Sequence, residues 1–178
     1  MYPFLRLAYQ VLRAWRMPPL NPTETHVSHH LCWPWDIDLW MELNNGRTLT
    51  LFDMGRIPMG QRAGLLALLR KKSWGLTIAG SVVRYRRRVR MFNRIEMRTR
   101  TIGWDNRFVY IEQIMMVRGT VTSQAVFRSA VTDRDGIVAP ERLLAELAPD
   151  HPPVPLPVWV ERWITAEAER PWPPELGA

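Results

Sequence analysis

The first hydrophobic pattern in the chain has the period of an amphipathic helix. Between residues 4 and 16, one side of a helical wheel is apolar and the other side carries arginines and other polar residues. Pro18 and Pro19 then end the helix. The apolar side comprises Phe4, Leu5, Leu7, Ala8, Val11, Leu12 and Trp15. This side either docks on the domain or a sister subunit, or lies on an anionic membrane surface; docking is favoured because single basic helices bind membranes weakly.

The middle of the chain predicts one strand and then a long helix. Residues 24–33 have an extended pattern, and a helical stretch runs from about residue 46 to residue 71. Gly60 and Gly64 indicate a break that leaves a long first piece and a shorter second one.

From Gly75 onward the apolar period changes to two, which is typical of strands. Short links with turn residues separate the runs, so we expect each strand to pair with the next in an antiparallel meander. Asp135-Gly136 ends this sheet, and residues 140–147 form a short helix. The four predicted strands are Leu76–Val89, Ile95–Trp104, Phe108–Val117 and Val121–Asp133.

The end of the chain is rich in proline and tryptophan. Its prolines favour an extended segment, and a short helix with Trp159, Trp163 and Ala166 on one side follows. We expect this tail to lie across the body of the domain or across a partner subunit, held by its tryptophans. The predicted organisation is an N-terminal amphipathic helix at 1–20, one domain at 21–148 and the tail at 149–178. Within the domain, a long central helix wrapped by a curved antiparallel β-sheet gives an α+β fold.

Composition narrows the setting of this domain. A single cysteine, Cys32, cannot form an internal disulfide and suits a reducing compartment. No apolar run reaches the length of a membrane span, and the first 16 residues lack the features of a signal peptide. We therefore expect a cytoplasmic protein that is soluble or attached to a membrane surface. The net charge of +7 is almost all arginine, which indicates an anionic partner or the coding bias of a GC-rich genome.

The polar junction between residues 36 and 47 carries the candidate chemistry. It places Asp36, Asp38, Asn44 and Asn45 directly before the long helix, where backbone N–H groups have no intrahelical partner. These residues either cap the helix, or they set a carboxylate beside free N–H groups that stabilise an oxyanion.

Other familiar sites are missing from the sequence. There is no Gly-rich phosphate loop, no G-x-S-x-G and no paired cysteines of zinc spacing. His26, His29 and His30 lie close together, but no carboxylate or cysteine completes a metal site with them. We expect no metal and no cofactor.

Two stretches of the chain carry a resemblance. The run from Asp36 to Arg47, followed by Phe52-Asp53-Met54-Gly55-Arg56, resembles the thioesterase-like hotdog proteins related to 4-hydroxybenzoyl-CoA thioesterase, with their pattern D-x-D-x-x-x-H-x-N-N-[AG]-R-Y. The stretch beginning at Gly80-Ser81 and continuing through Gly103-Trp104-Asp105 to Tyr110-Ile111-Glu112-Gln113 also fits. Together they extend the resemblance over about residues 24–140.

The resemblance implies a hotdog fold, a homodimer or dimer of dimers, and hydrolysis of an acyl-CoA, with coenzyme A as part of the substrate. In the characterised relatives the second aspartate of D-x-D is catalytic, which is Asp38 here, acting as nucleophile or general base. The backbone N–H at Asn45 would polarise the thioester carbonyl. Two positions depart from the family pattern: its histidine is Glu42, and its tyrosine is Thr48. Glu42 either tunes the site or marks a site that has lost its chemistry.

Arginines at alternate positions complete the candidate site. Arg84, Arg86, Arg88 and Arg90 would share one face of a strand, where they bind coenzyme A phosphates or are simply solvated. With Asn44, Gly46 and Ser81, the first three of these arginines are the expected substrate-binding residues. The second hypothesis is a non-catalytic hotdog protein that binds acyl-CoA or lipid at a membrane surface through residues 4–16. Nucleic-acid binding ranks far below, because aromatic residues do not alternate with the arginines as stacking platforms.

Overall fold

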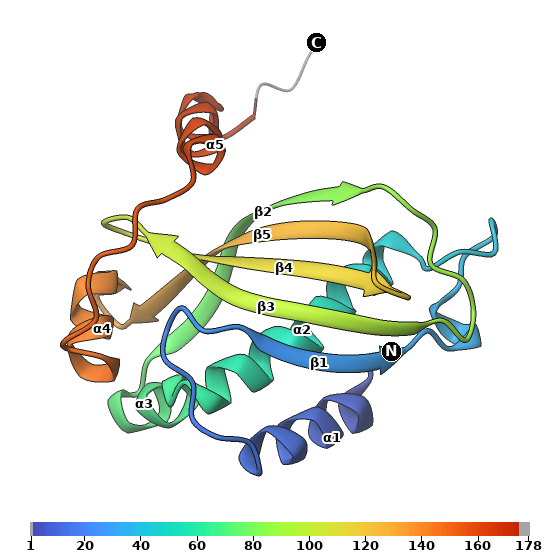
Figure 1. The fold of residues 1–178 in the computed structure, drawn as a ribbon. Helices are drawn as coiled ribbons and strands as arrows, with labels where there is room; N and C mark the ends of the chain where they lie inside the picture. Colours follow the sequence, from blue (N-terminus) through green and yellow to red (C-terminus); the bar gives the residue numbers. More distant parts are fainter. Residues whose placement is uncertain (1, 175–178) are drawn as a thin grey trace.

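A computed structural model describes residues 2–174 of the 178-residue chain. Met1, at the start of the predicted N-terminal segment, and residues 175–178, at the end of the predicted tail, lie outside the described residues. The predicted α+β hotdog architecture is confirmed: a curved antiparallel sheet wraps around the long helix α2 (Figure 1).

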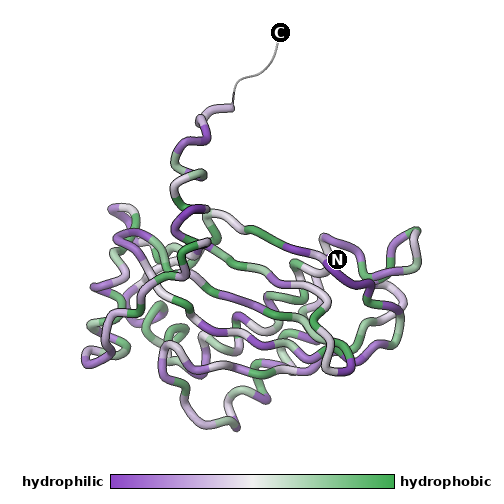
Figure 2. Tube along the Cα trace, turned by 45° about the horizontal axis from the view of Figure 1, so that its top comes forward, coloured by the Kyte–Doolittle hydropathy of each residue, from purple (hydrophilic) through white to green (hydrophobic). Residues whose placement is uncertain are grey.

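The sheet has six strands in the order β1-β3-β4-β5-β2, with β6 paired to β5. Every pairing is antiparallel. Polar and apolar residues alternate along the strands, as expected for a sheet with one face on the core (Figure 2). The strands are β1 (His26–Leu31), β2 (Gly75–Tyr85), β3 (Arg94–Trp104), β4 (Val109–Val117), β5 (Thr120–Asp133) and β6 (Gly136–Val138).

The predicted meander is wrong at β2. This strand pairs with β5 at one edge of the sheet, whereas β3 lies two strands further on, between β1 and β4. The prediction treated the link before β3 as a hairpin turn, but β2 ends at Tyr85 and residues 86–93 cross the end of the sheet. The sheet also does not end at Gly136, because β6 starts there and pairs with β5.

The central helix is broken where the glycines predict a break. Helix α2 (Asn45–Arg62) is followed by its C-cap Ala63, and Gly64 has a φ of 76° before α3 (Leu65–Lys72) begins. Glycine adopts this left-handed conformation at little cost. Gly60, the other predicted breaker, lies inside α2. The Asn44 side chain starts the helix by accepting a hydrogen bond from the Arg47 N–H.

The main core lies between α2 and the concave face of the sheet. Leu51, Phe52 and Met54 of α2 are fully buried against apolar side chains of β3, β4 and β5. A polar contact fixes the same layer, because the buried Gln113 donates to the Phe52 carbonyl and to Thr99. The sheet residues of this core are Ile95, Met97, Met115, Ala125 and Phe127.

Helix α1 (Phe4–Trp15) docks on the domain with only part of its apolar side, because Leu7 packs against the main core while most of that side faces outward. Its buried residues are Gln10 and Ala14, and Gln10 donates to the carbonyl of His29. Arg6 donates to Asp36 and to the Leu31 carbonyl. Hydrogen bonds therefore hold the inner face together with Leu7. Most of the apolar residues predicted to dock are exposed, including Phe4, Leu5, Leu12 and Trp15.

The C-terminal part contains two further helices, α4 (Pro140–Leu147) and α5 (Val158–Glu169), as predicted. Helix α5 lies on the side of the sheet opposite α2 (Figure 1). Val160 of α5 is fully buried, and Trp163 packs edge-on against Tyr110 of β4. In the segment before α5, Leu156 packs directly on Gly103 of β3. A Cβ added at Gly103 would lie 2.7 Å from Cδ2 of Leu156. Within residues 2–174 no helix is both long and apolar enough to span a membrane.

Candidate active site

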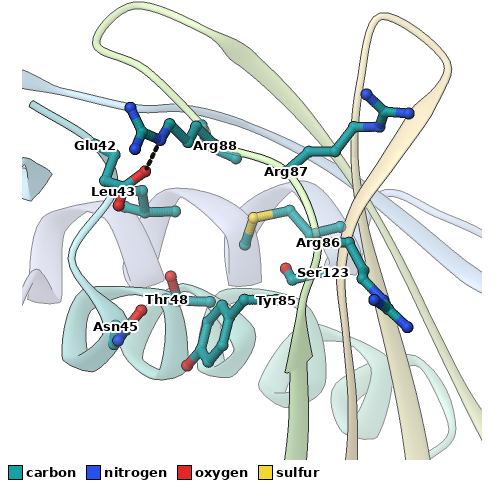
Figure 3. Close-up of a pocket in the computed structure, with 11 residues that line it drawn as sticks. Glu42, Leu43, Asn45, Thr48, Tyr85, Arg86, Arg87, Arg88 and Ser123 are labelled. Carbon is teal, nitrogen blue, oxygen red and sulfur yellow. Dashed lines mark ion pairs between the residues drawn. The ribbon is translucent and has the colours of Figure 1, made fainter.

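A pocket of about 230 Å³ opens at the N-terminal end of α2 (Figure 3). It is lined by the polar junction, the first turn of α2, the end of β2 with the stretch that follows it, and one residue each of β4 and β5. Its lining residues are Glu42, Leu43, Asn45, Thr48, Tyr85, Arg86, Arg87, Arg88, Val89, Met115 and Ser123.

The first aspartate of the junction has a structural role. The Asp36 side chain is completely buried, with Arg6 on Oδ2 and the Arg47 guanidinium 3.3 Å from Oδ1. Its Oδ2 also accepts the Trp33 N–H, and its carbonyl accepts the Asn44 N–H. Asp36 thus ties together α1, the short 3₁₀ helix Pro34–Asp36 and the start of α2.

The second aspartate, Asp38, organises a tight turn. Its Oδ1 accepts the N–H of Trp40 at 2.9 Å and that of Glu42 at 3.4 Å, and its own N–H donates to the Glu42 carbonyl. Met41 takes a φ of 58° to close this turn. The Asp38 side chain is half-buried and does not line the pocket. The pocket reaches Glu42 at the end of the same turn.

The first turn of α2 presents backbone donors to the pocket. Asn45 is the first residue of the helix, where the N–H has no intrahelical acceptor and the helix dipole is positive. Thr48, at the position of the family tyrosine, is buried and donates its hydroxyl to the Asn44 carbonyl. The side chain of Asn44 is used as the helix cap and Gly46 is exposed, so neither lines the pocket.

The predicted one-faced row of arginines is wrong. Because β2 ends at Tyr85, only Arg84 belongs to a strand, and the N–H groups of Arg86 and Arg87 both donate to the Thr122 carbonyl. Without strand alternation, three consecutive arginines line the pocket, Arg86, Arg87 and Arg88. They make its rim positive, with Glu42 3.1 Å from the Arg88 guanidinium (Figure 3).

The structure therefore brings together four of the predicted residues: Glu42, Asn45, Arg86 and Arg88. Two others lie elsewhere on β2. Ser81 is exposed on this edge strand, and Arg84 lines a separate hollow beside Trp159 of α5.

Sequence reasoning missed Tyr85 and Ser123 as pocket residues. Tyr85 is the last residue of a strand that was expected to continue. Ser123 pairs with Tyr85 across the β2–β5 ladder, a pairing that the meander prediction did not contain.

The histidines and the cysteine belong to the packing around α1 and β1. Burial, together with nearby Arg62, lowers the pKa of His26 to about 4, and burial lowers that of His30 to about 3. Burial raises the pKa of the Cys32 thiol to about 11, so it stays protonated. Among residues 2–174 no cluster of three or more His, Cys, Asp or Glu side chains is placed to hold a metal ion.

Comparisons with known proteins agree on one family. A family model described as the thioesterase-like superfamily matches residues 32–164. Protein THEM6 of Xenopus laevis is 32% identical over 111 residues, covering 62% of this chain and 54% of that protein. Protein THEM6 of Drosophila melanogaster is 31% identical over 114 residues, covering 62% and 59%. The chain thus matches little more than half the length of these relatives.

Solved structures share the fold at low sequence identity. The probable thioesterase YbaW of Escherichia coli superimposes with a TM-score of 0.64 at 14% identity, over 67% of this chain and 93% of that one. The gentisyl-coenzyme A thioesterase BH1999 gives a TM-score of 0.58 at 13% identity, over 69% and 99%. With the family match over most of its length, the chain belongs to the thioesterase-like superfamily of hotdog proteins.

Proposed function

We propose that this protein hydrolyses an acyl-CoA thioester at the N-terminal end of α2. The observation that carries the proposal is the pocket in which the first turn of α2 meets a rim of three arginines. Free N–H groups at a helix start favour the oxyanion that forms when a thioester carbonyl is attacked. Arginine guanidinium groups suit the phosphates of coenzyme A.

Asp38 is the proposed catalytic carboxylate. It lies outside the pocket lining of the single subunit, on the turn that ends at the pocket residue Glu42. As a general base it takes a proton from water, which attacks the carbonyl carbon; as a nucleophile it forms an acyl anhydride that water then cleaves. Both routes release coenzyme A as the free thiol and the acyl group as a carboxylate. The turn bonds to Trp40 and Glu42 both go to Oδ1 of Asp38 and would hold the carboxylate in one orientation.

Glu42 has a supporting role in this proposal. Its carboxylate lies against Arg88, which orients one arginine of the rim and offsets part of the positive charge. Glu42 therefore shapes the place where the anionic substrate enters. Asn45 supplies the carbonyl-polarising N–H, while Asn44 and Gly46 shape the first helical turn around it.

A homodimer would complete the site. Strand β2 is an edge of the sheet, and most of its residues are exposed, including Ile78 and Tyr85. An unpaired edge is a template for another strand. Pairing of β2 with β2 of a second copy would continue the sheet and bring the second copy beside Ser81, Arg84 and the pocket.

The test is steady-state hydrolysis of a panel of acyl-CoAs, from short and aromatic to long-chain, with release of free thiol as the readout. We expect turnover with at least one class, and a loss of at least about 100-fold in kcat with Asp38→Asn. Absence of turnover with every class, from a folded dimer, would contradict the proposal.

The exposed side of α1 favours a second candidate, a non-catalytic hotdog protein that binds acyl-CoA or lipid at a membrane surface. Leu5, Leu12 and Trp15 are 89%, 54% and 63% exposed, and polar bonds hold the helix in that orientation. Sedimentation with anionic liposomes tests this contact in the full chain. Leu12→Glu should reduce binding, whereas Val121→Glu, at an exposed position on β5, should not; equal binding of the two variants would rule out a membrane contact through this side of α1.

We propose that either function is carried out in the cytoplasm. The single cysteine, Cys32, is buried and forms no disulfide, which suits a reducing compartment.

A further inference from the structure

A second hollow lies beside the candidate active site, between two loops. One loop is the Asp38 turn, and the other is the crossing segment that follows β2. Three apolar side chains and two arginines line it: Trp40, Met41, Met91, Arg88 and Arg90. Its volume of about 480 Å³ is that of a small-molecule site.

Both loops are fixed by hydrogen bonds of their backbone N–H and carbonyl groups, one of them to a side chain. The Leu43 N–H donates to the Val89 carbonyl, which joins the two loops directly. The Asn93 side chain accepts from the Arg90 N–H, and the Asn93 carbonyl accepts from the Cys32 N–H. The hollow is therefore built before any ligand arrives, which lowers the entropic cost of binding.

The chemistry of the hollow combines a flat apolar surface with positive charge. Trp40 is 71% exposed although tryptophan is usually buried, so its ring is available for stacking. Of the two arginines, Arg88 is ion-paired with Glu42, whereas Arg90 has no ion pair among the described residues. A planar aromatic group that carries phosphate matches both features.

Arg88 also connects the hollow to the candidate active site, because its side chain lines both. A ligand with its phosphates at this arginine can reach into the pocket at Asn45 with one end and into the hollow with the other. Coenzyme A has this layout, since its pyrophosphate separates the adenosine 3′-phosphate from the pantetheine arm that carries the acyl group.

We propose that this hollow binds the adenosine 3′-phosphate end of coenzyme A, with the adenine stacked on Trp40 and the phosphates held by Arg88 and Arg90. The assignment rests on the proposed thioesterase function for the identity of the ligand. It differs from the sequence-based expectation, in which Arg84, Arg86, Arg88 and Arg90 bind the phosphates from one face of a strand and Trp40 has no part.

Direct binding tests the proposal without turnover. Coenzyme A, its 3′-dephospho form and pantetheine are titrated by calorimetry into the intact wild-type protein and four variants. Trp40→Ala should weaken coenzyme A binding about 5- to 150-fold, the range of base-stacking energies. Arg90→Gln should weaken it about tenfold, as for the loss of a charge-assisted hydrogen bond, and abolish the preference for coenzyme A over the dephospho form.

Matched controls separate the hollow from its surroundings. Leu39→Ala changes the neighbouring residue of the same turn, 93% exposed and outside the hollow. Arg134→Gln removes an arginine with 92% side-chain exposure near the β5–β6 turn. Both should bind coenzyme A like the wild type. Equal binding by Trp40→Ala and Leu39→Ala, or equal affinity for coenzyme A and pantetheine, would overturn the proposal.

The experiments distinguish a failure of the proposed nucleotide site from a failure of the proposed thioesterase function. Coenzyme A binding that depends on Trp40, without hydrolysis of any acyl-CoA, supports the hollow and contradicts the thioesterase. Asp38-dependent hydrolysis with equal kcat/KM for acyl-CoA and acyl-pantetheine supports the thioesterase and overturns the hollow.

Discussion

Nη1 of Arg6 lies 2.8 Å from Oδ2 of Asp36, so a residue of the N-terminal helix completes the shell of a carboxylate that has no solvent exposure. Arg6 precedes the part of the chain that the family model covers, whereas Asp36 lies within it. Helix α1 is thereby tied to the junction that leads into the candidate active site.

Loss of this contact should destabilise the protein. Removing one partner of a buried ion pair typically costs about 3–5 kcal/mol, because the other charge stays buried. Arg47 still faces Asp36, so for Arg6→Ala we expect a loss near the lower end, about 3 kcal/mol. Urea unfolding measures it. Arg13→Ala, at an exposed position of the same helix, should cost under about 0.5 kcal/mol; a similar loss in both variants would show that the Asp36 contact is not the cause.

The packing of α2 on the sheet predicts opposite outcomes for two glycines. A Cβ at Gly55 would lie 2.7 Å from both the Met97 sulfur and the Thr99 hydroxyl, whereas at Gly60 the nearest atom is 3.5 Å away. Gly55→Ala should therefore destabilise by about 1–3 kcal/mol through overpacking. Gly60→Ala should be neutral or stabilise by up to about 1 kcal/mol. Thermal unfolding of the two variants tests this, and a lower unfolding temperature for Gly60→Ala than for Gly55→Ala would contradict this packing.

Buried histidines predict a loss of stability in acid. The pKa of His26 is lowered from 6.5 to about 4 and that of His30 to about 3, so the unfolded chain binds protons that the folded chain does not. The protein should therefore lose stability as the pH falls below about 6.5. For each histidine, the unfolding equilibrium constant should rise by up to about tenfold per pH unit. The decline should continue toward pH 4. Unfolding free energies between pH 7 and pH 4.5 test this; His30→Gln should flatten the slope, and a slope unchanged from the wild type would contradict it.

The free edge of the sheet predicts a dimer through β2. Ile78 of β2 is 38% exposed, and Val27 on the opposite edge strand β1 is similarly exposed at 37%. Light scattering with size-exclusion chromatography should give a dimer for the wild type and for Val27→Arg, and a monomer for Ile78→Arg. A dimer that survives Ile78→Arg but dissociates in Val27→Arg would place the interface at β1.

Local patterns predicted the elements of this fold but not how the strands are ordered. The break in the central helix follows from Gly64, and the amphipathic period predicted α1 within a residue at its C-terminal end. The position of β2 beside β5 depends on the whole sheet, and nothing in residues 86–93 alone distinguishes a crossing segment from a turn. The same applies to α1, whose docking through Arg6 and Gln10 depends on partners far along the chain.

Only part of the candidate site was predictable from the family pattern. Asn45 at the start of α2 and Glu42, at the position of the family histidine, line one pocket, whereas Asp38 does not. The arrangement of the arginines was not predictable, because the row was expected to continue a strand that ends at Tyr85. The use of Asp36 as a buried structural anchor also required the fold, since both aspartates of the motif look alike in sequence.

The most direct test of the central claim compares Asp38→Asn with the wild type on the acyl-CoA that the wild type hydrolyses best. Dimer mass and circular dichroism are checked in parallel, and Leu39→Ala serves as the control within the same turn. We expect kcat to fall by at least about 100-fold in Asp38→Asn, as for the loss of a general base, with fold and dimer unchanged. Full turnover by a folded Asp38→Asn dimer would contradict the assignment of Asp38 and the mechanism built on it.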